Sequence, residues 1–132
     1  MPRLRTETYG TGDQSWLGST HAIYSARTET IDPAATGWVA ATHWPNGYIP
    51  SGTPVAKVGG VLVPYDKTEA TTTGAGVLAG FVLTDQPVYG TGKIAAPLLD
   101  HGRVKVAKVP YSGGFAAPAA AAKSAAVQLV FI

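Results

Sequence analysis

The sequence predicts a mainly β domain, built as a small barrel or a sandwich-like fold. Three observations carry this prediction: the apolar and β-branched runs are short, Gly and Pro turn signals recur about every eight to twelve residues, and one segment alone has strong helix propensity. Short strands separated by such turns are typical of all-β barrels and sandwiches. A chain of 132 residues is long enough for one domain and a terminal arm, and too short for two full domains.

The first part of the chain is predicted to hold two short strands and a turn. Thr, Tyr and β-branched residues favour a strand over His21–Ile31, which Asp32-Pro33 closes. Trp38–Thr42 is a second short strand candidate. Pro45-Asn46-Gly47 then indicates a turn, because Asn and Gly accept positive φ while Pro fixes its own.

The second part is the more strand-rich. Ile49–Val58 leads into the turn Gly59-Gly60, and Val61–Asp66 continues as the next strand. The short apolar run Val77–Leu83 fits a strand that is buried on both faces. Ala95–Leu99 is a further strand candidate.

The last third alternates strand and helix signals. Arg103–Val109 alternates basic and apolar residues with period two, the pattern of a half-exposed strand. Ala116–Lys123 predicts one short helix, with Pro118 in its first turn. Val127–Ile132 is an apolar terminal strand that we expect to be buried in the sheet, because an exposed run of this kind would aggregate.

The first twenty residues are predicted to form an extended N-terminal arm (residues 1–20) on a single β-rich domain (residues 21–132). Aliphatic residues are few there, and Gly10–Ser15 is a loop sequence. Such a segment buries too little apolar surface to order alone. Arg3–Tyr9 nevertheless alternates β-compatible side chains, so it can pair as a strand where a partner offers an edge.

Composition and charge narrow the class of partner. Charged residues make up 14% of the chain, against about a quarter in typical soluble domains, which suggests that another chain covers part of the surface. The net charge is +2, and the densest basic group, Arg103, Lys105 and Lys108, fits a solvated strand face better than a nucleic-acid footprint. The chain has no cysteine, and its apolar runs are too short to span a bilayer.

Catalytic and metal-binding patterns are weak. Of the three histidines, only His101 has a carboxylate neighbour, and Asp100-His101-Gly102 reads first as a turn between two strands. Ser51 lacks a Gly-x-Ser-x-Gly context for a nucleophile. Gly90–Lys93 lacks the first Gly and the final Ser or Thr of a phosphate loop. The aspartates lie mostly in predicted turns, where their side chains bond backbone amides. We therefore expect no enzymatic activity, cofactor or metal site.

The three tryptophans, Trp16, Trp38 and Trp44, all lie in the first third of the chain. Trp38 and Trp44 are expected to pack inside the domain. Trp16 has two interpretations of equal weight: it caps the core, or it anchors an interface, where large aromatic side chains supply much of the binding energy.

The order of motifs from Pro50 onward resembles that of a known family. Pro50–Val58 carries a Pro-x-x-Thr-Pro lead-in to a strand, Val61–Asp66 follows a Gly turn, and a Thr/Gly loop leads to Gly76–Leu83. Leu98–Val109 then reads as a Gly-split hairpin before the Ala-rich helix and the apolar C-terminal strand. This order resembles the lambda-type head decoration proteins of tailed bacteriophages over a little under two thirds of the chain. The first fifty residues depart from the family pattern.

The resemblance implies a β-clip fold, in which a bent two-stranded ribbon ends in an incomplete small barrel. It implies a homotrimer on the outer surface of the expanded phage head, where it binds the major capsid protein and stabilises the shell against internal DNA pressure, with no direct contact to nucleic acid or membrane. It also implies an N-terminal arm that adds a strand to the capsid protein. The residues expected to bind the capsid are Pro2, Arg3, Leu4, Arg5, Thr6, Glu7, Thr8, Tyr9 and Trp16.

Two other classes of function fit the sequence. One is a tail, spike or fibre component of a virion, since these are also β-rich oligomers with Gly- and Thr-rich loops. The other is a small carbohydrate-binding or hydrolytic β module that uses Trp38 and Trp44.

Overall fold

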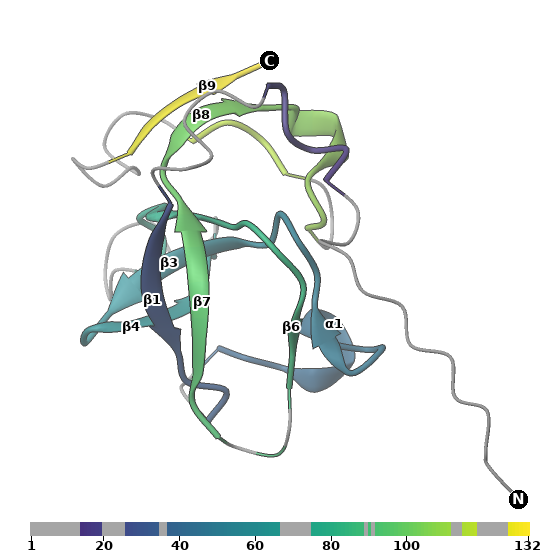
Figure 1. The fold of residues 1–132 in the computed structure, drawn as a ribbon, viewed down its shortest axis with the longest axis vertical. Helices are drawn as coiled ribbons and strands as arrows, with labels where there is room; N and C mark the ends of the chain where they lie inside the picture. Colours follow the sequence, from purple (N-terminus) through teal and green to yellow (C-terminus); the bar gives the residue numbers. More distant parts are fainter. Residues whose placement is uncertain are drawn as a thin grey trace, which may run out of the picture.

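A computed structural model describes residues 14–19, 26–34, 37–66, 75–88, 90, 92–111, 115–118 and 127–132. Its centre is a closed five-stranded barrel, and a smaller sheet lies at one end of that barrel (Figure 1). The prediction of a mainly β fold is confirmed. The barrel is closed, whereas the resemblance implied an incomplete one.

The barrel closes through strands that are far apart in the sequence. Its order is β1, β4, β3, β5, β7 and back to β1. β1 pairs antiparallel with β7 over its full length and meets β4 in parallel at one pair, Ile31 with Leu62. The other neighbouring pairs are antiparallel. The strands are β1 (Arg27–Ile31), β3 (Pro54–Val58), β4 (Val61–Pro64), β5 (Gly80–Val82) and β7 (Ile94–Leu99).

The hairpin of β3 and β4 follows from its turn sequence. Gly59 and Gly60 have φ angles of 61° and 84°, and a two-residue hairpin turn with positive φ at both positions matches the twist of the flanking strands. The predicted Gly-Gly turn is therefore confirmed. The residues from Leu78 to Val82 are all buried, which confirms the prediction of a strand covered on both faces.

Two smaller sheets complete the β structure. β8 (His101–Val104) pairs in parallel with β9 (Gln128–Phe131), so the C-terminal segment is a strand, as predicted. It is not buried as expected, because Val130 is 53% exposed and Ile132 56% exposed. β2 (Tyr48–Ile49) pairs antiparallel with β6 (Gln86–Pro87), next to the turn at Gly47, whose amide donates to the carbonyl of Trp44.

The predicted hairpin over Leu98–Val109 is wrong. β7 pairs with β1 and β5, while β8 pairs with β9. Asp100-His101-Gly102 is not a reversing turn either, because His101 and Gly102 already belong to β8 and the chain passes directly from the barrel into the second sheet (Figure 1). Each strand finds a distant partner, so the local alternation of the sequence does not produce a local pairing.

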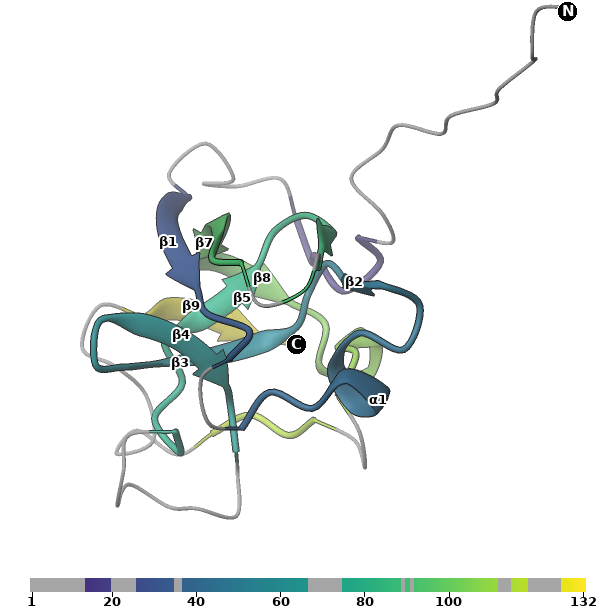
Figure 2. The same cartoon turned by 90° about the horizontal axis from the view of Figure 1, so that it is seen from below.

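Helical structure differs in place from the prediction. Trp38–Thr42 is not a strand: α1 (Ala40–His43) is a single helical turn, and it lies across the molecule from β1 (Figures 1 and 2). Arg103–Val109 is a strand only to Val104, because η2 (Val106–Lys108) is a 3₁₀ turn. The helix predicted over Ala116–Lys123 falls mostly outside the described residues, and residues 115–118 are not helical. None of the helices in the described ranges is long and apolar enough to cross a membrane.

Two apolar clusters divide the interior. One fills the barrel and includes Ile31, Val55, Leu62 and Leu98. The other includes Phe81 and residues from β8 and β9, so it lies between the barrel and the second sheet; its buried members are Trp16, Tyr65, Leu78, Phe81, Leu99, Val104, Val109, Phe115 and Leu129. The second cluster attaches the small sheet to the barrel.

The close contact between β5 and β7 predicts that a side chain at Gly80 lowers the free energy of unfolding. Gly80 has a φ of 153°, and a Cβ there would lie 2.6 Å from the carbonyl oxygen of Leu99. We expect Gly80→Ala to lower the free energy of unfolding by at least about 2 kcal/mol, because backbone must shift in the barrel wall. Gly60→Ala is the matched control: its φ is positive, but its Cβ meets nothing within 4 Å, so a loss of about 1 kcal/mol is expected. If urea denaturation gives the two variants equal losses in the free energy of unfolding, this packing is contradicted.

Candidate functional site

Trp16 lies in the core and not on the surface. Its side chain is 1% exposed, and its ring stacks on that of Phe81 with centroids 5.5 Å apart. Its indole N–H donates to the hydroxyl of Ser51 (3.0 Å). Of the two interpretations of Trp16, core packing is therefore the one that the structure supports. Trp16 was expected among the capsid-binding residues; its side chain is instead buried in its own domain.

Ser51 holds this region together through three hydrogen bonds. Its hydroxyl accepts from Trp16 and donates to the carbonyl of Leu83 (2.6 Å), and its amide donates to a carboxylate oxygen of Asp85 (2.7 Å). The side-chain amide of Gln14 donates to the same carbonyl of Leu83 (2.8 Å). The Ser51 hydroxyl is thus used in structural bonds, as buried polar groups generally are.

The backbone on either side of Trp16 is also bound to the domain. The amide of Gly18 donates to the carbonyl of Arg103 (2.9 Å), and the amide of Lys105 donates to the carbonyl of Trp16 (2.6 Å). Leu17 forms an antiparallel bridge with Val104. Residues 14–19, which we call the root, therefore run beside β8, where Figure 1 shows them in purple.

The root fits closely against Gly52. A Cβ at Gly52 would lie 2.5 Å from an indole carbon of Trp16, so only glycine leaves room for the ring. Gly52 also has a φ of 91°. The folded domain therefore begins no later than Gln14, seven residues before residue 21, where the predicted domain begins. The remaining predicted arm residues, from Pro2 to Tyr9, lie outside the described residues.

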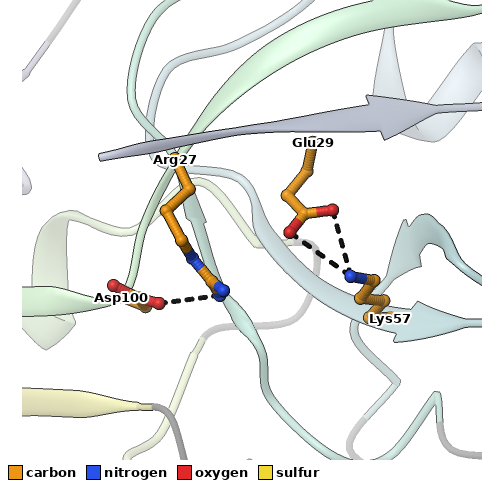
Figure 3. Close-up of polar contacts among 4 residues, drawn as sticks. All are labelled: Arg27, Glu29, Lys57 and Asp100. Carbon is orange, nitrogen blue, oxygen red and sulfur yellow. Dashed lines mark hydrogen bonds and ion pairs between the residues drawn. The ribbon is translucent and has the colours of Figure 1, made fainter. Parts of the chain in front are cut away.

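Two ion pairs tie β1 to its neighbours. Arg27 contacts Asp100 (2.9 Å), and Glu29 contacts Lys57 (3.2 Å) (Figure 3). Both carboxylates are largely covered, while the cations remain about half exposed. Asp100 is thus bound to a strand of the barrel and does not cap a turn.

Two further aspartates accept hydrogen bonds from backbone amides, Asp32 within its predicted turn and Asp85 from a residue far away in the sequence. A carboxylate oxygen of Asp32 accepts from the amide of Ala34 (3.1 Å), and Asp85 accepts from Ser51. In the described part of the chain, no group of three or more His, Asp or Glu side chains lies where it could hold a metal ion.

Trp38 and Trp44 pack inside the domain, as predicted. Trp38 is 8% exposed, and its indole N–H donates to the carbonyl of Leu62 (3.1 Å). Trp44 packs against the barrel cluster and contacts Trp38, with ring centroids 5.9 Å apart. Trp38 therefore forms no exposed platform for a sugar, and Trp44 is partly buried.

An apolar groove of about 850 Å³ is lined by residues of α1, β3 and β4. Tyr65 and Tyr111 lie at one end, with ring centroids 6.2 Å apart, and burial raises the pKa of Tyr65, so its hydroxyl stays protonated at neutral pH. The hydroxyl of Thr53 is already donated to the carbonyl of Pro50 (2.7 Å). The groove has the volume of a ligand site, and its lining includes the imidazole of His43 and the carboxylate of Asp66 besides the hydroxyl groups. Its prolines are Pro45, Pro50, Pro54, Pro64 and Pro110.

Comparisons of the chain with protein-family models, with curated proteins and with solved structures each give no match. What the chain does is therefore inferred from its residues and their arrangement.

The packing of the root predicts that the stability of the domain depends on Trp16 and not on the residues before the root. Trp16→Ala should lower the free energy of unfolding by about 3–5 kcal/mol, because it leaves a cavity and removes the donor to Ser51. Deletion of residues 2–12, which leaves the root intact, should change it by less than about 0.5 kcal/mol. Urea denaturation followed by fluorescence measures both. A large loss from the deletion, or none from Trp16→Ala, would overturn this assignment.

His43 predicts a pH dependence of stability. Its Nδ1 accepts from the amide of Val39 (2.9 Å), and burial lowers the pKa of its imidazole below the ordinary value of about 6.5. Between the lowered pKa and that value the unfolded chain binds more protons, so stability is lost as the pH falls through this window. His43→Asn keeps an acceptor but does not titrate. The variant should lose less stability than the wild type between about pH 7.5 and 5 in thermal unfolding; identical profiles would contradict this role.

Proposed function

We propose that this chain is a capsid decoration protein, which binds the outer surface of an expanded phage head as a trimer and stabilises the shell against internal DNA pressure. The observation that carries the proposal is the fixed root. Trp16 and Gly18 hold residues 14–19 on the domain, and the strand-competent segment Arg3–Tyr9 precedes them in the sequence. An extended segment can add a strand to a partner's sheet edge, and a fixed point of attachment reduces the freedom that the segment loses on binding.

The motifs that resemble the decoration family also support the proposal. Pro50–Val58, Val61–Asp66 and Gly76–Leu83 contain β3, β4 and β5, which are adjacent in the barrel. Leu98–Val109, expected as a hairpin, is the part of the resemblance that the strand pairing does not match.

The mechanism is stabilisation by selective binding. A protein that binds the expanded shell and not its precursor lowers the free energy of the expanded state, as any ligand specific for one state does. Main-chain hydrogen bonds between Arg3–Tyr9 and a strand of the major capsid protein supply affinity, and Leu4 and Tyr9 fill pockets beside it. Three arms on one trimer act together, so modest contacts give tight binding.

A tail or fibre component is the second candidate, because a fixed root with a strand-forming segment would serve any virion surface. Location on the particle by electron microscopy separates the two. A carbohydrate-binding module has less support, since Trp38 is buried and Trp44, which is partly buried, packs against the barrel cluster. Clear hits on a glycan array would place the carbohydrate-binding module ahead of the tail or fibre component.

Binding to phage heads tests the proposal. We expect light scattering to give a trimer, and sedimentation to show saturable binding to expanded, undecorated heads but not to unexpanded precursors. Deletion of residues 2–12 should abolish head binding and leave the trimer intact. A monomer that ignores expanded heads would rule the proposal out.

Strand addition is tested more sharply by proline. Backbone N–H groups alternate in direction along a strand, so one of Thr6 and Glu7 must donate to the partner. Proline at that position removes the donor. Thr6→Pro or Glu7→Pro should weaken head binding at least about tenfold, while the controls Thr6→Ala and Glu7→Ala bind nearly as well as the wild type. If both proline variants match their alanine controls, the segment does not bind as a strand.

A further inference from the structure

The outer face of the β8–β9 sheet combines exposed cations with exposed aliphatic side chains. Inward-facing Val104 and Leu129 are buried in the second cluster, whereas Arg103 and Lys105 alternate outward and are exposed. On β9 the outward residues are Gln128 and Val130, which is 53% exposed, and Ile132 beyond the strand end is 56% exposed. We call Arg103, Lys105, Val130 and Ile132 the basic–apolar face.

The parallel register places these side chains in two rows. Arg103 is paired with Val130. The amide of Ile132 donates to the carbonyl of Val104 (2.9 Å), and the amide of Val106 donates to the carbonyl of Ile132 (3.1 Å), so Ile132 lies beside Lys105. A cationic row on β8 thus runs next to an aliphatic row on β9.

Among the residues that the structure describes, the charges of this face take part in no ion pair. The ion pairs found among the described residues involve Arg27 and Lys57, not Arg103 or Lys105. Lys108 on η2 is also exposed nearby in the sequence. Exposed cations on a sheet discourage aggregation even where they bind no partner. That role explains Arg103 and Lys105, but it does not explain why Val130 and Ile132 are left open beside them.

The root borders this face. The amide of Gly18 donates to the carbonyl of Arg103, and a Cβ at Gly18 would lie 2.8 Å from Ile132 and 2.9 Å from the Cβ of Arg103. Tyr9, the last residue of the strand-competent segment, is nine residues from Gly18. An extended chain spans at most about 3.6 Å per residue, so a segment bound to a shell holds this face within about 32 Å of its contact.

We propose that the basic–apolar face is the second contact of the domain with its protein partner, and that it fits an acidic surface carrying exposed aliphatic side chains. The inference rests on the proposed function, which makes the capsid shell that partner. Carboxylates of the shell would pair with Arg103 and Lys105, and its aliphatic groups would cover Val130 and Ile132. Opposite charges across such a rim set register and speed association.

Charge reversal tests the face, with a matched control at the far end of β7. Lys93 is exposed and directly precedes β7, which ends next to β8 (Figure 1). Lys105→Glu and Arg103→Glu should each weaken binding to expanded heads at least about tenfold and reduce its salt dependence, while Lys93→Glu binds as the wild type does. Val130→Ser should weaken binding severalfold. Val39→Ser, at a residue 51% exposed near α1, should not.

The outcomes separate this inference from the proposed function. If the wild type fails to bind heads, the proposed function is overturned and this face with it. If the wild type binds and Lys105→Glu and Arg103→Glu bind equally well, the face alone is overturned. Loss of the trimer in these variants would make it a contact between copies of the chain. Tight binding of the wild type to a short DNA duplex, lost in the same variants while head binding persists, would make it a nucleic-acid surface. Loss of the trimer and binding of DNA each overturn the assignment of this face to the shell.

A folding control accompanies each variant. Unchanged unfolding midpoints confirm that the variant is folded.

Discussion

The indole of Trp16 is the contact on which the arrangement of this domain depends. It stacks on Phe81 of the barrel, lies against Gly52 and donates to Ser51, which in turn binds Leu83 and Asp85. The backbone around the same residue is bonded to β8. One side chain near the N-terminus therefore joins the barrel, the loop at Ser51 and the second sheet.

This arrangement divides the chain into parts with different physical roles. The barrel cluster and the cluster around Phe81 supply stability, because they bury the large apolar side chains. The root has a fixed position on the domain, since its backbone is bonded to β8, Trp16 lies tightly against Gly52, and Gly18 lies tightly against Arg103 and Ile132. The sequence before the root has little apolar surface of its own, and under the proposed function its ordering energy comes from a partner. A binder with a fixed root loses less freedom on binding than one whose segment is tethered loosely.

Local signals in the sequence predicted much of the fold, but they did not predict which strands pair with one another across long separations in the chain. The Gly59-Gly60 turn, the buried run Val77–Leu83 and the C-terminal strand follow from turn chemistry and hydrophobic pattern. The pairing of β1 with β7 and of β8 with β9 joins segments far apart in the chain, and the alternation of Arg103–Val109 falsely indicated a hairpin. α1 was missed because Trp38–Thr42 is apolar and short enough to fit either a strand or a helical turn. The burial of Trp16 depends on Ser51, Gly52 and Phe81, at least 35 residues away, and no local pattern specifies that contact.

The most direct test of the central claim is an electron cryo-microscopy map of expanded heads with the protein bound. A fixed root with a strand-forming segment predicts trimers on the outer surface, residues 2–9 added as a strand to the capsid protein, Trp16 in the same buried position, and the β8–β9 sheet facing the shell. A map in which the bound domain contacts the shell while residues 2–9 make no contact with it would contradict the claim.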